Sequence, residues 1–289
     1  MSFDLFAEAL VAGFLLGCFY AAVSIGLSVA FGLLDVPHIA HPAFLVLGAY
    51  GVFGLNRLGV DPLLAGVLLS PLFFCAGIGI YRFYHTVFER RGADAGLRGL
   101  AFFFGIAFIV EVGLILGYGV DQRMVEAPYI GHGISLGEYR LPYRMLVAFA
   151  VAFGLTLLLS AYLSRSFMGR AIKAVAQDEV GLALMGADPV KVKQRAFGIA
   201  TATCSIAGAL LIIIGPVEPG LGRLYIGRCF CVVVLAGLGS MKGTLVAGIL
   251  LGIAESVVLT SAGASWAPAV AFGVLLLVLA VRPTGLFRR

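Results

Sequence analysis

Long runs of apolar residues, separated by short polar stretches, make up most of this chain. The pattern predicts nine apolar segments, approximately over residues 10–34, 43–55, 62–81, 97–120, 141–164, 197–216, 226–238, 244–261 and 268–281. Because apolar and polar residues do not alternate within them, these runs are typical of membrane helices and not of barrel strands. A crossing helix needs ~20 mostly apolar residues. We therefore expect one all-α polytopic membrane domain over residues 1–289, with about eight crossings and two short or broken segments in corresponding halves.

Composition and charge agree with a membrane protein. The chain is 61% hydrophobic and 12% charged, and the charged share is about half that of a soluble domain. The net charge of +5 comes from basic residues at the ends of apolar runs, so it predicts an orientation and not nucleic-acid binding. The charged residues before the first run are Asp4 and Glu8, and no basic residue precedes it. We therefore expect this run to remain as a span and not to be cleaved as a signal peptide. The five cysteines form no C-x-x-C pair, which favours buried free thiols.

Basic residues in short loops predict the orientation. Those expected on the cytoplasmic side are Arg82, Arg90, Arg91, Arg98, the basic residues of 165–195, Arg282, Arg288 and Arg289. The loop 121–140 carries two basic and three acidic residues and is expected outside. The N-terminus is then outside and the C-terminus cytoplasmic in a plasma or inner membrane, and whether 226–238 crosses fully stays open.

Two of the apolar segments are short and lie next to breaks. One break covers residues 35–42, with Pro37, His38, His41 and Pro42, and the other covers 237–243, with Gly237 and Gly239. Broken segments in corresponding halves of a transporter point to its translocation pathway, because irregular backbone at membrane depth survives only beside a cavity or inside protein. The alternative is that both are ordinary loops between tilted helices.

Ionisable residues within apolar spans are a second group of pathway candidates. Glu111 and Glu255 lie in such spans, where a carboxylate is expensive and by default has a polar partner and a function. They could serve a proton-coupled secondary transporter or channel, or simply be neutral and hydrogen-bonded between helices. Arg223 and Arg228, near the outer end of the second short segment, could meet an anionic solute or anchor helix ends.

A metal site and an enzyme are both disfavoured. His38 and His41 are three residues apart, but Asp35 is the one further ligand nearby, so a hydrogen-bonded pathway or packing role is preferred. No Ser/His/Asp set or pair of acids clusters on a recognisable frame. We expect no metal, no cofactor and no catalytic residue.

The longest polar interval, residues 165–195, has the pattern of a two-part surface helix. Apolar side chains recur at helical spacing at Ile172, Val175, Ala176, Val180 and Ala183. Asp178 is a suitable N-cap for a turn that runs to Met185 and that Gly186 ends; Asp188-Pro189 then starts the next helix. Spacing alone leaves two interpretations open: a docking site for a protein, or an interfacial hairpin on anionic lipid.

Four stretches resemble the branched-chain amino acid ABC transporter permeases. They are SFMGRAIKAVAQDE (166–179) with LMGAD (184–188), the Ala40-His41 turn with LGAY (47–50), GLGS (237–240) with GILLGIAE (248–255), and RPTGLF (282–287). The resemblance covers nearly the whole chain in order. It departs at the first break, where the family's Asn two residues before the Ala-His pair is absent and its Gly after the His is Pro42, so solute specificity there is expected to differ.

This resemblance implies a permease subunit that translocates a small polar solute, with branched-chain or related amino acids first. Its partners would be a second permease, similar or identical, two cytoplasmic ATPases, an extracytoplasmic solute-binding protein and membrane lipid. ATP hydrolysis would lie on the ATPases, since this chain has no G-x-x-x-x-G-K-[ST] motif. The residues 165–195 would be the loop that couples to the ATPase, with contact and hinge residues Gly169, Arg170, Ala176, Gln177, Asp178 and Gly186.

Overall fold

The computed structural model of the chain describes residues 3–91, 95–136, 139–282 and 285–287, so Arg288 and Arg289 lie outside the described residues. Its elements are α1 (Phe3–Ala30), α2 (His41–Asn56), α3 (Pro62–Val87), a 3-10 turn (Glu89–Arg91), α4 (Ala95–Tyr118), β1 (Gly133–Leu136), β2 (Tyr139–Pro142), α5 (Tyr143–Arg165), α6 (Phe167–Gln177), α7 (Glu179–Leu184), α8 (Pro189–Ile214), a 3-10 turn (Pro219–Leu221), α9 (Gly222–Ala236), α10 (Met241–Ala262), a 3-10 turn (Ala264–Trp266) and α11 (Ala267–Val281).

Each of the predicted apolar segments overlaps one of these helices, which confirms the all-α polytopic prediction. Seven helical segments in the described part of the chain are long and apolar enough to cross a membrane. The helices α2, with 16 residues, and α9 and α11, with 15 each, are shorter than a full crossing. The helix α9 becomes a candidate span of 18 residues only together with the 3-10 turn before it. The hairpin of β1 and β2 was not predicted; it pairs Gly133 with Pro142 and lies outside the helices.

Two long helices, α1 and α8, form the centre of the bundle. The helix α1 packs on α10, and α8 packs on α3 and α2. Small residues allow this close approach, as is common between membrane helices. A Cβ added at Gly248 of α10 would lie 2.7 Å from the backbone oxygen of Gly17 in α1, and one added at Gly48 of α2 would lie 2.7 Å from that of Cys204 in α8.

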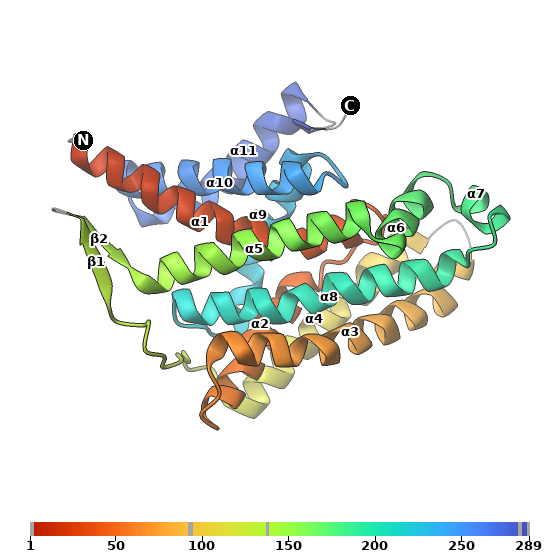
Figure 1. Cartoon of the computed structure of the whole chain (residues 1–289), viewed down its shortest axis with the longest axis horizontal. Helices are drawn as coiled ribbons and strands as arrows, with labels where there is room; N and C mark the ends of the chain where they lie inside the picture. Colours follow the sequence, from red (N-terminus) through yellow and green to blue (C-terminus); the bar gives the residue numbers. More distant parts are fainter. Residues whose placement is uncertain (1–2, 92–94, 137–138, 283–284, 288–289) are drawn as a thin grey trace.

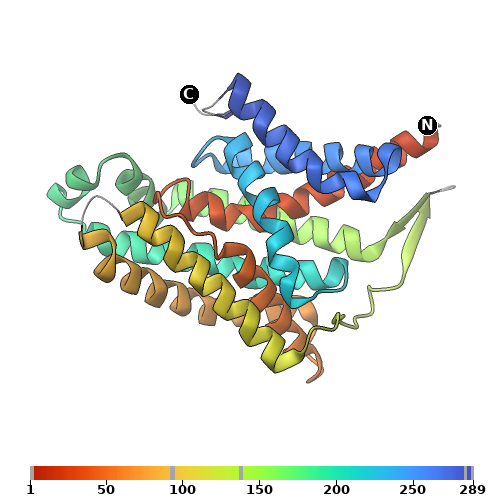
Figure 2. The ribbon, with the colours of Figure 1, turned by 180° about the vertical axis from the view of Figure 1, so that it is seen from behind.

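The two ends of the bundle differ in structure. Figure 1 shows the start of α1 and the β1–β2 hairpin at one end and α6 with α7 at the other, and Figure 2 shows the same arrangement from behind. The helices α5, α8 and α3 run side by side on the face seen in Figure 1, whereas α4 and α9 lie on the face seen in Figure 2. Residues predicted for the coupling segment therefore gather at the end opposite the hairpin.

Candidate functional site

The first break separates α1 from α2 and is held by its histidines. Asp35 adopts a φ of 53°, a left-handed conformation unusual for a residue with a side chain. His41 begins α2, and its Nε2 lies 2.8 Å from the backbone oxygen of Val23 in α1. His38 is fully buried, with its ring centroid 4.6 Å from that of Phe197. Within the described part of the chain neither ring nitrogen of His38 has a hydrogen-bond partner.

The second break separates α9 from α10 and lies against the first. Gly237 and Gly239 have φ of 81° and 83°, values that favour glycine. A Cβ added at Gly239 would lie 3.0 Å from the backbone oxygen of Gly32, which follows α1. The Thr244 hydroxyl, at the start of α10, donates to the Ser28 hydroxyl of α1 at 3.1 Å. The structure therefore brings the second break against the end of α1 and the residues that lead into the first break, about 200 residues away in sequence.

The C-terminal RPTGLF stretch also reaches the second break. The backbone N–H of Leu286 donates to the oxygen of Leu235 at 2.9 Å. A Cβ at Gly285 would lie 2.5 Å from the Cα of Gly237. Pro283 and Thr284 of this stretch lie outside the described residues.

Both intramembrane carboxylates are paired with arginines. Glu255, 3% exposed, accepts a hydrogen bond from the Tyr20 hydroxyl at 2.5 Å and from Arg228 Nε at 3.0 Å. Arg228 also lies over the Tyr20 ring, 5.5 Å from its centroid. Glu111 pairs with Arg223, next to a cavity of about 30 Å³, room for roughly one or two waters. Each arginine thus meets a carboxylate of the same chain.

The segment after α5 forms two short helices, as predicted, with different burial. The Ser166 hydroxyl caps α6, and the Asp178 carboxylate caps α7 by accepting from the Gly181 N–H at 2.9 Å. Gly186 ends α7 with a φ of 81°. The Asp188 carboxylate caps α8 through the N–H groups of Val190 and Lys191, so every cap predicted from sequence is confirmed.

The predicted apolar stripe is correct at Ile172 and Val175 of α6, which are buried, whereas Ala176 of the same helix is exposed. Beyond α6 the stripe is wrong, because Val180 and Ala183 are exposed. The cause there is Asp178, whose extended backbone (φ −153°, ψ 105°) ends α6 and turns the chain, so one helical period does not run through both helices. No residue of α7 is buried.

The remaining predicted coupling residues divide in the same way. Arg170, Gln177, Asp178 and Gly186 are exposed. Gly169 is buried, and a Cβ there would lie 2.5 Å from the Cα of Leu163 in α5. Gly169 therefore sets the approach of α6 to α5 and is not part of the exposed surface.

A group of charged side chains that the sequence did not reveal holds α7 in place. Lys193 Nζ in α8 lies 2.9 Å from Glu89 Oε1 and 2.7 Å from Glu179 Oε2. Glu89 Oε2 also accepts from the Tyr81 hydroxyl at 2.7 Å and lies 2.7 Å from His85 Nδ1. We call these five residues the Lys193 cluster. It joins the end of α3 and the following turn to the starts of α7 and α8.

Electrostatics favour the charged form of the carboxylates in this region. Burial raises the pKa of Glu89, but hydrogen bonds from His85, Tyr81 and Lys193 outweigh it, and the pKa lies below its ordinary value. The N–H and the ammonium of Lys191 likewise lower the pKa of Asp188 at the start of α8. No local pattern predicts the Lys193 cluster, since Lys193 and Glu89 are 104 residues apart.

Sequence comparison identifies a family for this arrangement. Residues 9–279 match the model of the family described as branched-chain amino acid transport system / permease component. This chain belongs to that family. The permease is 29% identical over 296 residues to the high-affinity branched-chain amino acid transport system permease protein BraD of Pseudomonas aeruginosa, covering 98% of this chain and 96% of BraD.

Two further comparisons concern one curated protein and one solved structure. The permease is 28% identical over 299 residues to the LivH protein of Escherichia coli, a high-affinity branched-chain amino acid transport system permease, covering 98% of this chain and 96% of LivH. Among solved structures, the permease is similar to a chain of PsaBC from Streptococcus pneumoniae in complex with Fab. The match covers 98% of the permease and 94% of that chain, with 13% identity and a TM-score of 0.48. The chain is thus a multi-pass membrane protein of a family of transport subunits.

Proposed function

We propose that the permease is the membrane-spanning subunit of an ATP-driven importer and that its solute is a branched-chain or related amino acid. BraD and LivH are named as permease proteins of branched-chain amino acid transport systems. A solute-binding protein would deliver the solute, two cytoplasmic ATPases would supply the energy, and a second permease, similar or identical, would complete the membrane part.

The surface of α7 is the observation that carries this proposal. Val180, Leu184 and Met185 are 70%, 83% and 86% exposed, on a helix with no buried residue. Large apolar side chains that stand out of a short helix at the end of the bundle favour contact with another protein. The Lys193 cluster holds the exposed surface of α7 in one position. We assign this surface to contact with an ATPase, together with Arg170, Ala176, Gln177, Asp178 and Gly186.

The two breaks supply the proposed pathway. Gly239 of one break lies against Gly32 and Leu33, in the chain that leads to His38 and His41 of the other, and Gly237 lies against Gly285. Irregular backbone at membrane depth is tolerated beside a cavity or within protein. A small shift of α10 against α1 would move both breaks together, which is how ATPase closure at α7 could open a path.

Glu111 and Glu255 support this scheme better than proton coupling. Each carboxylate forms an ion pair with an arginine of α9, a neighbouring helix. We therefore assign both to helix positioning along the pathway, and we place the alternative, a stand-alone secondary transporter or channel, second.

The orientation of the permease in the membrane is inferred from the end of the bundle at which the basic residues lie. The basic 165–195 segment lies at the end opposite the start of α1 (Figure 1). With basic loops cytoplasmic, the N-terminus is outside, the C-terminus is cytoplasmic, and residues 1–289 form a single permease domain in the inner (plasma) membrane. The β1–β2 hairpin then faces the solute-binding protein.

Reconstitution tests the proposal. Proteoliposomes that contain the permease, its ATPases and a leucine-loaded binding protein should take up leucine on addition of ATP. Permease alone should take up none under a proton gradient. Gradient-driven uptake by the permease alone would contradict the proposal.

A further inference from the structure

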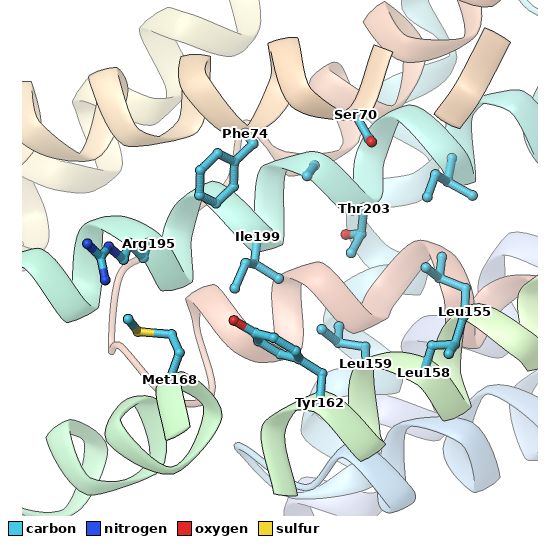
Figure 3. A pocket seen from close by; sticks show the side chains of 12 residues that line it. Ser70, Phe74, Leu155, Leu158, Leu159, Tyr162, Met168, Arg195, Ile199 and Thr203 are labelled. Carbon is cyan, nitrogen blue, oxygen red and sulfur yellow. The ribbon is translucent and has the colours of Figure 1, made fainter. Parts of the chain in front are cut away.

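A long groove runs along α8 between α3 and α5. Its volume is about 550 Å³, within the ~300–1,000 Å³ range of ligand sites. Figure 3 shows Ile199 of α8 on its floor, Phe74 of α3 on one side, and Leu155, Leu158 and Leu159 of α5 on the other. Such a surface suits hydrocarbon chains.

Arg195, the one charged side chain among the lining residues, lies at one end of the groove beside Met168, and the hydroxyl of Tyr162 is on the same side (Figure 3). The hydroxyls of Ser70 and Thr203 lie further along the groove, and each donates to a backbone oxygen of its own helix. Arg195 is exposed, and no ion pair or hydrogen bond of its side chain is found among the residues that the structure describes. The groove therefore has an apolar length and a cationic end.

The charges around that end are in excess on the positive side. The carboxylates of Glu179 and Asp188 form ion pairs with Lys193 and Lys191, respectively. Four further basic residues of the segment are exposed and have no ion pair within the described parts of the chain: Arg165, Arg170, Lys173 and Arg195. Against them stands Asp178, whose carboxylate already caps α7. An anionic group is the missing counterpart.

We propose that the groove binds one anionic phospholipid, with an acyl chain along Ile199 and Leu158 and the phosphate at Arg195. Cationic pockets between membrane helices recognise acidic headgroups, and a guanidinium makes strong charge-assisted bonds to phosphate. A second permease packed on this face would enclose Arg195 and require an acid of its own, since an unpaired buried charge is costly. Lipid supplies both the hydrocarbon and the phosphate.

Native mass spectrometry of the full-length permease tests this proposal. Samples in mixed micelles with phosphatidylglycerol or with phosphatidylcholine report which lipid stays bound. Wild type should retain phosphatidylglycerol in preference, and Arg195→Gln should weaken its retention about fivefold, the worth of one basic residue near an anionic headgroup. Lys242→Gln removes the same charge from an exposed site at the start of α10 and should change nothing. Equal retention of both lipids by wild type, or equal losses in the two variants, would overturn the proposal.

A second variant fills the groove without touching the charge. Ala202 of α8 lines it, and Ala202→Phe should displace the acyl chain and reduce phosphatidylglycerol retention by a similar factor. Leu276→Phe, on the exposed face of α11, is its control. Lipid retention unaffected by Ala202→Phe would place the lipid elsewhere. The groove could instead be a contact between two permeases. In that case wild type would form a dimer without bound lipid, and Arg195→Gln or Ala202→Phe would dissociate it. That result would also overturn the proposal.

Discussion

Lys193 fastens α7 to the membrane bundle through Glu179, with Nζ 2.7 Å from Oε2. Lys193 is held in turn by Glu89, at the end of α3. A force applied to α7 thus reaches α8 and α3 without crossing the solvent-exposed chain between α7 and α8. In the proposed importer, the Lys193 cluster is the rigid element between the ATPase and the pathway.

Removal of the Lys193 ammonium should loosen α7. In Lys193→Met, Glu89 and Glu179 lose their shared partner, and local stability at 179–187 should fall by about 1–3 kcal/mol. Hydrogen exchange of these amides measures the change. Lys191→Met is the control, because its pair with Asp188 is exposed (72% and 45%) and therefore screened by solvent. Equal exchange in the two variants would contradict a fastening role.

The Lys193 cluster should also respond to acid. The pKa of Glu89 is lowered in the folded protein, so its stabilisation is fully present above the unfolded pKa, ~4.3, and is lost as the pH falls through the lowered value. Protection factors at 179–187 should therefore be constant near neutrality and drop in strong acid. Glu89→Gln should have low protection at neutral pH and a weaker dependence on pH. A wild-type drop between pH 8 and 6 would point to a different group.

Gly186 and Arg170 should matter for energy coupling and not for assembly. Gly186→Val forces a β-branched residue into φ 81°, at a cost of about 1–2 kcal/mol, and redirects the chain after α7. Arg170→Glu reverses a charge on the exposed face of α6. Both variants should express normally and lose binding-protein-stimulated ATP hydrolysis.

One control for these variants keeps the left-handed backbone at residue 186, and the other reverses a charge at a different exposed site. Gly186→Asn should retain most activity because asparagine tolerates the left-handed region. Arg82→Glu, which reverses an exposed charge in α3, should retain stimulation. Full stimulation in Arg170→Glu and Gly186→Val would contradict docking at this segment.

Glu255 is expected to stabilise the protein through Arg228. Glu255→Gln leaves the half-buried guanidinium without its anion and should destabilise by about 3 kcal/mol, seen as a lower melting temperature in micelles. Adding Arg228→Met should restore much of the loss, because an apolar replacement of the whole pair is often neutral. If Glu255→Gln left stability intact and abolished proton-driven uptake, a proton-coupled mechanism would be supported instead.

The contact between α1 and α10 should not tolerate a larger side chain. A Cβ at Gly248 already lies 2.7 Å from the Gly17 oxygen and 2.8 Å from the Ala21 nitrogen, so Gly248→Val should cost about 1–3 kcal/mol or more. Gly113→Val in α4 is the matched control, since a Cβ there meets nothing within 4 Å. Thermal unfolding of the two variants distinguishes them, and equal melting temperatures would argue against close packing here.

Local features were predictable because neighbours along the chain determine them. Apolar runs, the caps Asp178 and Asp188, the stop at Gly186 and both breaks could be read directly, since each depends on residues within about one turn. The predicted stripe failed at Val180 and Ala183 for the complementary reason. The sequence shows a helical period but not the turn that Asp178 imposes on it.

The sequence by itself determined a polytopic helical permease, the positions of its breaks and the two-part surface segment. Tertiary structure decided which of these parts meet: Gly239 with Gly32, Glu255 with Arg228, and Lys193 with Glu89 and Glu179. These pairings join residues far apart in sequence, and the packing of α1 and α8 at the centre of the bundle sets them. Periodicity reports the face of one helix, whereas a contact requires two helices to be placed against each other.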